Sequence, residues 1–92
     1  MKFEWDEEKN LENIRRHGID FADVPEMFQW YMFIDLDDRE EYGEVRWVGI
    51  GMLRNSIVVV VFTEQPDDTI RIISARKANK YERKKYQRAI PH

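Results

Sequence analysis

Alternating and helical patterns divide the chain into short elements, beginning near the amino terminus. Phe3 and Trp5 alternate with charged residues, as in a short strand that buries one face. Asp6 has the side chain of a helix N-cap and Gly18 is a common helix stop, which together predict a first helix over residues 6–17.

The spacing of apolar and polar residues predicts that this first helix has one buried face and one solvent-exposed face. Leu11, Ile14 and His17 follow helical spacing, so we expect the two apolar side chains to pack on the core, with His17 at the edge of their stripe. Four polar residues are expected to lie in solvent: Lys9, Asn10, Asn13 and Arg16.

A second helix is predicted to begin at Asp20. Its apolar side chains recur at intervals of three and four residues: Phe21, Val24, Met27 and Phe28. Pro25 lies inside this segment and removes one backbone donor, so we expect the helix to begin late or to kink there.

The middle of the chain changes to the patterns of β-strands. Strands are predicted over residues 31–36, 44–53, 56–63 and 69–75. Short turns join the last three, a polar connection precedes them, and a final helix follows over residues 76–89. The order β-α-α-β-β-β-β-α indicates a single α+β domain, residues 1–92, with helices packed on an antiparallel sheet.

Composition narrows the possible chemistry. The chain has no cysteine, which excludes disulfides, thiolate metal sites and cysteine nucleophiles. Its two histidines, His17 and His92, are too few for a histidine-rich metal site. The longest apolar run, residues 57–62, is too short to cross a bilayer, and the amino terminus lacks the apolar core of a signal peptide. We therefore expect a soluble cytoplasmic protein with no membrane partner.

The net charge of −3 hides an uneven distribution of charge along the chain. Residues 76–92 carry seven basic side chains and one acidic side chain, whereas residues 1–75 carry 8 basic and 17 acidic ones. The carboxyl-terminal segment is therefore a candidate phosphate-binding surface. The other interpretation is an ordinary solvated helix.

The predicted last helix combines cations with two tyrosines. Its basic stripe consists of Arg76, Lys80, Arg83 and Lys84. On such a helix, tyrosine rings can stack on bases while the cations bind phosphates. Tyrosines can equally anchor a helix to a sheet, which is the interpretation we favour for Tyr86 and leave open for Tyr81.

Other candidate residues lie outside that helix. His17 suits either a cap for the helix carboxyl end or proton transfer near neutral pH. Arg46 and Arg71 fall in predicted strands and would add positive charge to a cleft if they share its face. An acidic cluster over residues 35–41 lacks the ligand spacing and glycine of a calcium loop, so we expect a solvated turn and no metal there.

Two blocks of sequence carry a family resemblance. The first contains Trp5-Asp6 and Arg16-His17-Gly18, and the second extends over residues 71–86. Further matching positions are Lys9-Asn10, Asn13, Phe21-Ala22-Asp23, Phe28, Gly43-Glu44-Val45-Arg46, Gly51 and residues 59–64. Over nearly the whole chain, the sequence resembles the BrnT family of type II toxins, small bacterial ribonucleases with a RelE-like fold.

The resemblance implies a toxin that cleaves RNA and inhibits translation. It also implies an antitoxin of the BrnA kind with a ribbon-helix-helix DNA-binding part, through which the complex would contact DNA and repress its own operon. It implies no cofactor. The alternatives are a non-catalytic domain whose basic helix binds an acidic protein or RNA, and an inactive relic that serves as a co-repressor.

Site residues follow from this hypothesis. We expect His17 to transfer a proton with the assistance of Lys9, and Arg76 and Arg83 to hold the phosphate oxygens, while Glu82 orients a neighbouring arginine. The expected RNA-binding residues are Lys80, Tyr81, Lys84 and, as weaker candidates, Arg46 and Arg71.

Overall fold

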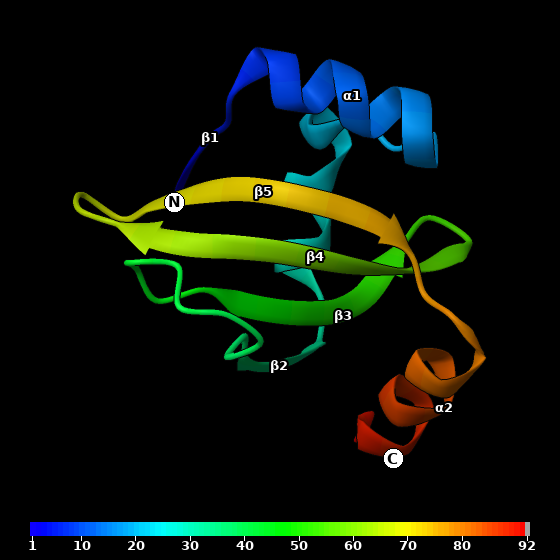
Figure 1. Ribbon diagram of the computed structural model, residues 1–92. Helices are drawn as coiled ribbons and strands as arrows, with labels where there is room; N and C mark the ends of the chain where they lie inside the picture. Colours follow the sequence, from blue (N-terminus) through cyan, green and yellow to red (C-terminus); the bar gives the residue numbers. More distant parts are fainter. Residues whose placement is uncertain (92) are drawn as a thin grey trace.

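One five-stranded sheet organises the chain (Figure 1). The structure, a computed structural model, describes residues 1–91, and His92 lies outside them. In chain order the elements are β1 (Lys2–Glu4), α1 (Glu7–His17), the 3-10 helix η1 (Phe21–Gln29), β2 (Met32–Leu36), β3 (Trp47–Leu53), β4 (Ser56–Gln65), β5 (Thr69–Lys77) and α2 (Lys80–Ala89). The predicted α+β class is confirmed.

The sheet is mixed, so the prediction of an antiparallel sheet is wrong for one strand. The strand order is β1-β5-β4-β3-β2, and β2 to β5 form an antiparallel meander. β1 runs parallel to β5, pairing Phe3 with Ile70. The parallel pairing is possible because α1, η1 and three strands separate β1 from β5, which leaves ample chain for a crossover.

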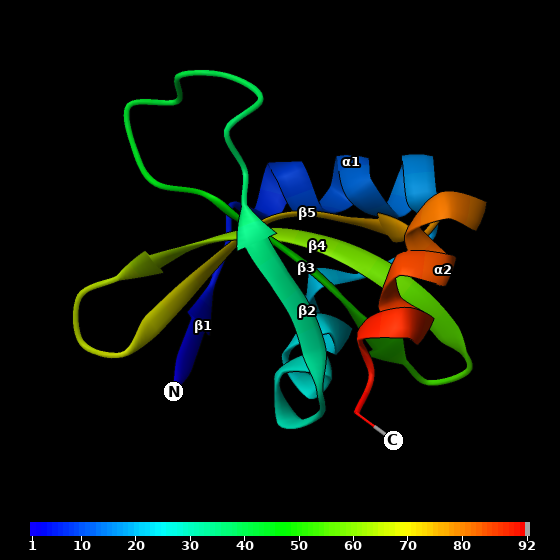
Figure 2. The same ribbon diagram turned by 90° about the horizontal axis from the view of Figure 1, so that it is seen from below.

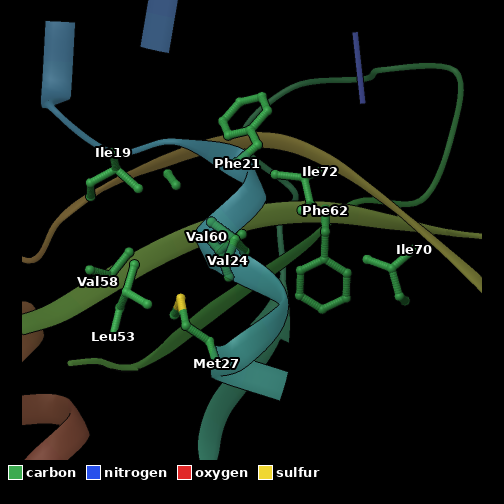
Figure 3. Close-up of a cluster of buried hydrophobic side chains, with 11 residues drawn as sticks. Ile19, Phe21, Val24, Met27, Leu53, Val58, Val60, Phe62, Ile70 and Ile72 are labelled. Atoms are coloured by element: carbon green, nitrogen blue, oxygen red, sulfur yellow. The ribbon is translucent and has the colours of Figure 1, made fainter. Parts of the chain in front are cut away.

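The first core lies between η1 and one face of the sheet. Figure 3 shows Phe21, Val24 and Met27 of η1 in one buried cluster with Val60 and Ile72 of the sheet. The predicted second helix is therefore present, but as a 3-10 helix. Its tighter bonding is visible where the Asp23 amide donates to the Asp20 carbonyl three residues back, at 3.0 Å. Pro25, which lacks an N–H, is tolerated within it.

The second core lies on the opposite face, under α2. Along β4, Val58 and Val60 face the first core, whereas Val59 packs with Ile50 and Tyr86 in the second. Tyr86 is only 4% exposed, which confirms its predicted role as the anchor of α2. Within residues 1–91, no helix combines the length and apolar character needed to cross a bilayer.

Helix α1 packs through amides, which corrects the expected orientation of this helix. Leu11 is 61% exposed, while Asn10 and Asn13 are buried. Asn13 donates to the Ala75 carbonyl at 2.9 Å and accepts from the Ala75 amide at 3.1 Å. β1 ends before this part of β5, so Asn13 takes the place of a neighbouring strand along an otherwise open sheet edge.

The last helix begins later than predicted. Arg76 and Lys77 belong to β5, where they pair with Val59 and Val58 of β4. Asn79 caps α2 and forms a capping box with Glu82. The predicted basic stripe therefore does not lie on one helix, because Arg76 projects from the sheet.

Candidate active site

The main cavity lies over the sheet face that α2 covers in part, and measures about 300 Å³. Strand residues such as Val61 and Ser74 form its floor. One wall is the start of the loop between β2 and β3, and the other is the beginning of α2. Figure 2 shows that loop on the opposite side of the sheet from η1. The cavity thus combines side chains from three separate parts of the chain.

Arg76 and Glu82 form an ion pair in this cavity. The two guanidinium nitrogens Nη1 and Nη2 donate to Oε1 and Oε2 of Glu82, both at 2.7 Å. Glu82 Oε1 also accepts from the Asn79 amide at 2.9 Å. The same carboxylate therefore completes the capping box of α2 and binds the guanidinium of Arg76. Such bonds are what is expected of a residue that orients Arg76.

Both members of the pair stay charged. The hydrogen bond from Arg76 lowers the pKa of Glu82, against the opposing effect of burial. The same hydrogen bond raises the pKa of Arg76. The side chain of Arg76 is 38% exposed, and its Nε–H and one Nη2–H are available to a ligand.

Aromatic and basic side chains extend the site along α2. Tyr81 lines the main cavity and is 73% exposed, so its ring is accessible for stacking. A second groove of about 510 Å³ adjoins the cavity, and both contain Phe33, Tyr81 and Lys85. Lys84 and Arg88 line its far part. The two hollows form one continuous surface between β2 and α2.

His17 lines a separate, smaller cavity of about 190 Å³. Lys9 and Arg16 line it too, and Ser74 lines both this cavity and the main one. The structure therefore brings His17 and Arg76 to adjoining cavities on either side of Ser74. It does not bring them into a single cavity.

Several predicted residues lie outside the main cavity. Arg83 donates to the Ala78 carbonyl at 2.9 Å, which ties it to the connection before α2. Arg71 pairs with Glu4, and Arg46 pairs with Glu44 and lies 4.0 Å from the centre of the Tyr42 ring. Lys80 is exposed in the first turn of α2. These cations were predicted from the sequence to share one RNA-binding site, but the fold places them on different surfaces.

Arg39 is a cavity residue that the sequence did not indicate. It lies in the polar connection that was expected to be a solvated turn, and it lines the main cavity opposite α2. Its Nε and Nη2 donate to Asp37 at 2.8 and 2.9 Å. Asp37, from the predicted acidic cluster, is almost fully buried. In the part of the chain that the structure describes, no three His or acidic side chains are grouped to hold a metal.

Comparisons with known proteins agree with this fold. A family model described as "Ribonuclease toxin, BrnT, of type II toxin-antitoxin system" matches residues 5–82. The crystal structure of the Brucella abortus ribonuclease toxin BrnT is similar, with a TM-score of 0.68 and 31% sequence identity. That match covers 87% of this chain and 99% of the Brucella chain. No curated protein matches the sequence.

These findings define a ribonuclease toxin of a type II toxin–antitoxin system, as the sequence resemblance implied. Within that class, the chain belongs to the BrnT family.

Proposed function

We propose that this protein cleaves RNA without a metal ion, by attack of a ribose 2′-OH on the adjacent phosphorus. A bond forms between O2′ and phosphorus while the bond from phosphorus to O5′ breaks. A base takes the proton of the 2′-OH, and an acid gives a proton to the departing O5′. The products are a 2′,3′-cyclic phosphate and a free 5′-hydroxyl.

The observation that carries this proposal is the guanidinium of Arg76, held by Glu82 in the main cavity. As the 2′-OH attacks, negative charge grows on the non-bridging phosphate oxygens. A guanidinium fixed in place stabilises that charge without having to reorganise first. Its planar array of donors also matches two oxygens of one phosphate.

Proton transfer is assigned to His17, with Lys9 assisting. Support comes from their shared cavity, which adjoins the Arg76 cavity at Ser74. A ribose next to a phosphate on Arg76 would then extend across Ser74 toward the imidazole. An imidazole at this position suits either transfer, removal of the proton from O2′ or protonation of O5′.

The RNA is proposed to continue along the groove between β2 and α2. Tyr81 would stack on a base, and Lys84, with Lys80 nearby on α2, would contact flanking phosphates. Arg46 and Arg71 remain weaker candidates, because each is paired with a glutamate and neither lines the main cavity or the groove. Arg83 is proposed to support the start of α2 instead of the phosphate.

The proposed partner is an antitoxin of the BrnA kind with a ribbon-helix-helix part. It would cover the cavity, and the complex would bind and repress its own operon through the antitoxin alone. Support comes from membership of a type II toxin–antitoxin family. Co-expression with the neighbouring reading frame tests this partner, because growth arrest should then disappear.

The central test is substitution of Arg76. We expect Arg76→Ala to lower kcat/KM for RNA cleavage by about 10²- to 10³-fold, because a charge-stabilising donor is lost. Arg15→Ala is the matched control, since Arg15 is an exposed, glutamate-paired arginine on α1. The measurement is cleavage of a long RNA by purified protein whose fold is checked by circular dichroism. Full activity of a folded Arg76→Ala protein would contradict the assignment.

The chemistry has its own test. An RNA with 2′-deoxyribose at the cleaved position should resist cleavage there, because the nucleophile is missing, and EDTA should leave the rate unchanged. Cleavage of the deoxy substrate would exclude the proposed attack, and inhibition by EDTA would exclude metal independence. A wild-type protein that binds RNA and leaves it intact would instead favour the non-catalytic alternative.

A further inference from the structure

The loop between β2 and β3 contains a buried carboxylate, although a solvated turn was expected there. The Asp37 side chain is 1% exposed, and its oxygens accept from Arg39 and from the Tyr42 hydroxyl. Burial of a carboxylate is costly unless such bonds compensate it. The bidentate bond from Arg39 provides most of that compensation, and it fixes the guanidinium relative to the sheet.

Arg39 itself remains accessible to a ligand. Its side chain is 66% exposed, and only two of its five N–H groups are used by Asp37, which leaves three. It lines the main cavity together with Arg76 and Glu82, although it comes from the opposite wall.

The charges of the two walls interact. The pKa of Glu82 is lowered mainly by Arg76 and also by the charge of Arg39. The charge of Arg39 likewise opposes the rise that Glu82 causes in the pKa of Arg76. Two guanidinium groups that face one cavity, each kept in place by a carboxylate, repel each other across it. An anion between them would convert that repulsion into two attractions.

We propose that Arg39 is a second phosphate-binding residue, which contacts the substrate phosphate from the β2–β3 loop while Arg76 contacts it from β5. This inference rests on the proposed RNA cleavage. It gives the loop a role in substrate binding, and it identifies Asp37 as the positioning residue that holds Arg39.

Arg39→Ala should lower kcat/KM for RNA cleavage by about 100-fold, on the scale of one lost charge-stabilising donor. Arg39→Lys should recover only part of the activity, because an ammonium lacks the planar array of donors. Arg54→Ala is the matched control: Arg54 is 68% exposed and paired with Asp23, but it lies outside the main cavity. Since Arg39→Ala leaves Asp37 buried without its partner, Asp37→Asn/Arg39→Ala provides a second variant without that unpaired charge.

Binding gives a readout that a purely structural role would not change. Affinity for a mixed-sequence 2′-O-methyl oligonucleotide, which cannot be cleaved, is measured against salt concentration. Loss of one phosphate contact should reduce the slope of log affinity against log salt by about 0.7. The expected result is this reduction in Arg39→Ala and in Asp37→Asn/Arg39→Ala, and none in Arg54→Ala.

The outcomes separate the two proposals. If wild-type protein cleaves RNA and the folded Arg39 variants match Arg54→Ala in rate and slope, the role of Arg39 is overturned while the proposed function stands. If wild-type protein cleaves no RNA, the proposed function fails, and the role of Arg39 in that reaction fails with it.

Discussion

The side chain of Glu82 connects the start of α2 with Arg76 of β5. Its carboxylate accepts from the Asn79 amide and from both terminal nitrogens of Arg76. The cap of α2 and the position of the Arg76 guanidinium therefore both depend on the ionised carboxylate of Glu82. Such a group has a direct effect on stability, because its pKa is lower in the folded state than in the unfolded chain.

The sign of this effect gives a testable prediction. A lowered pKa means that the contribution of Glu82 to stability is present above its ordinary pKa of 4.5 and is lost as the pH falls below it. The free energy of unfolding should therefore fall between about pH 5 and pH 3 in wild-type protein, and fall less steeply in Glu82→Gln.

Urea denaturation at a series of pH values measures this difference. Glu26→Gln removes an exposed carboxylate of η1 and is the control expected to follow the wild-type curve. If Glu82→Gln and Glu26→Gln show the same pH dependence, Glu82 does not contribute in this way.

At the scale of elements, the attachment of α1 depends on polar contacts. Asn10 accepts from the Phe21 amide at 2.8 Å, and Asn13 holds both backbone groups of Ala75. These buried bonds replace the apolar contacts that usually dock a helix. Since these bonds join α1 to main-chain groups of η1 and β5, they also fix the position of α1 relative to the sheet.

Asn13→Ala should destabilise the protein by about 2–4 kcal/mol, because it leaves the buried N–H and C=O of Ala75 without this partner. Leu11→Ala, on the exposed side of the same helix, should change stability by no more than about 0.5 kcal/mol. Chemical denaturation of both variants measures the contrast. A larger loss for Leu11→Ala would show that α1 docks through its apolar residues after all.

Periodicity predicted most elements but not their partners. Asp6, Gly18 and the β-branched run of β4 gave clear local signals, and α1 and β4 formed close to where they were expected. Local signals do not reveal which face of a helix packs against the sheet. Leu11 looked like a core residue and Asn13 like a surface residue, because only the fold reveals that β5 has unpaired backbone groups to satisfy.

The site was predictable only where local sequence encodes it. Glu82 and Arg76 were singled out from their residue types and the family resemblance, and the structure pairs them. Arg39 gave no signal, because its significance depends on a loop that returns to the same sheet face as α2 and forms the other wall of the main cavity. The basic stripe failed for a related reason: the helix was predicted to begin before Asn79, in residues that pair with β4.

At the scale of the whole molecule, β4 connects the two cores. Alternate residues of this one strand contribute to the core under η1 and to the core under α2. Neither core can therefore lose its packing without disturbing the strand that supports the other. The charges are similarly distributed over the molecule, since cations of the carboxyl-terminal segment line cavities whose other walls come from β2 and its loop.

This shared strand predicts a single cooperative unfolding transition. In a variant with the exposed Trp30 replaced by Phe, tryptophan fluorescence reports on Trp5 and Trp47, which pack against the first core. Far-ultraviolet circular dichroism reports on the helices and the sheet. The two signals should give coincident urea midpoints. Separate midpoints would show that α2 and the second core unfold on their own.

Ser74 is a small residue at the boundary between the histidine cavity and the arginine cavity. A bulky ring in its place, as in Ser74→Phe, would act as a partition and isolate the imidazole from the guanidinium without altering either. Under the proposed mechanism such a protein would not cleave RNA, and it could be used as an inactive toxin to isolate the antitoxin from living cells.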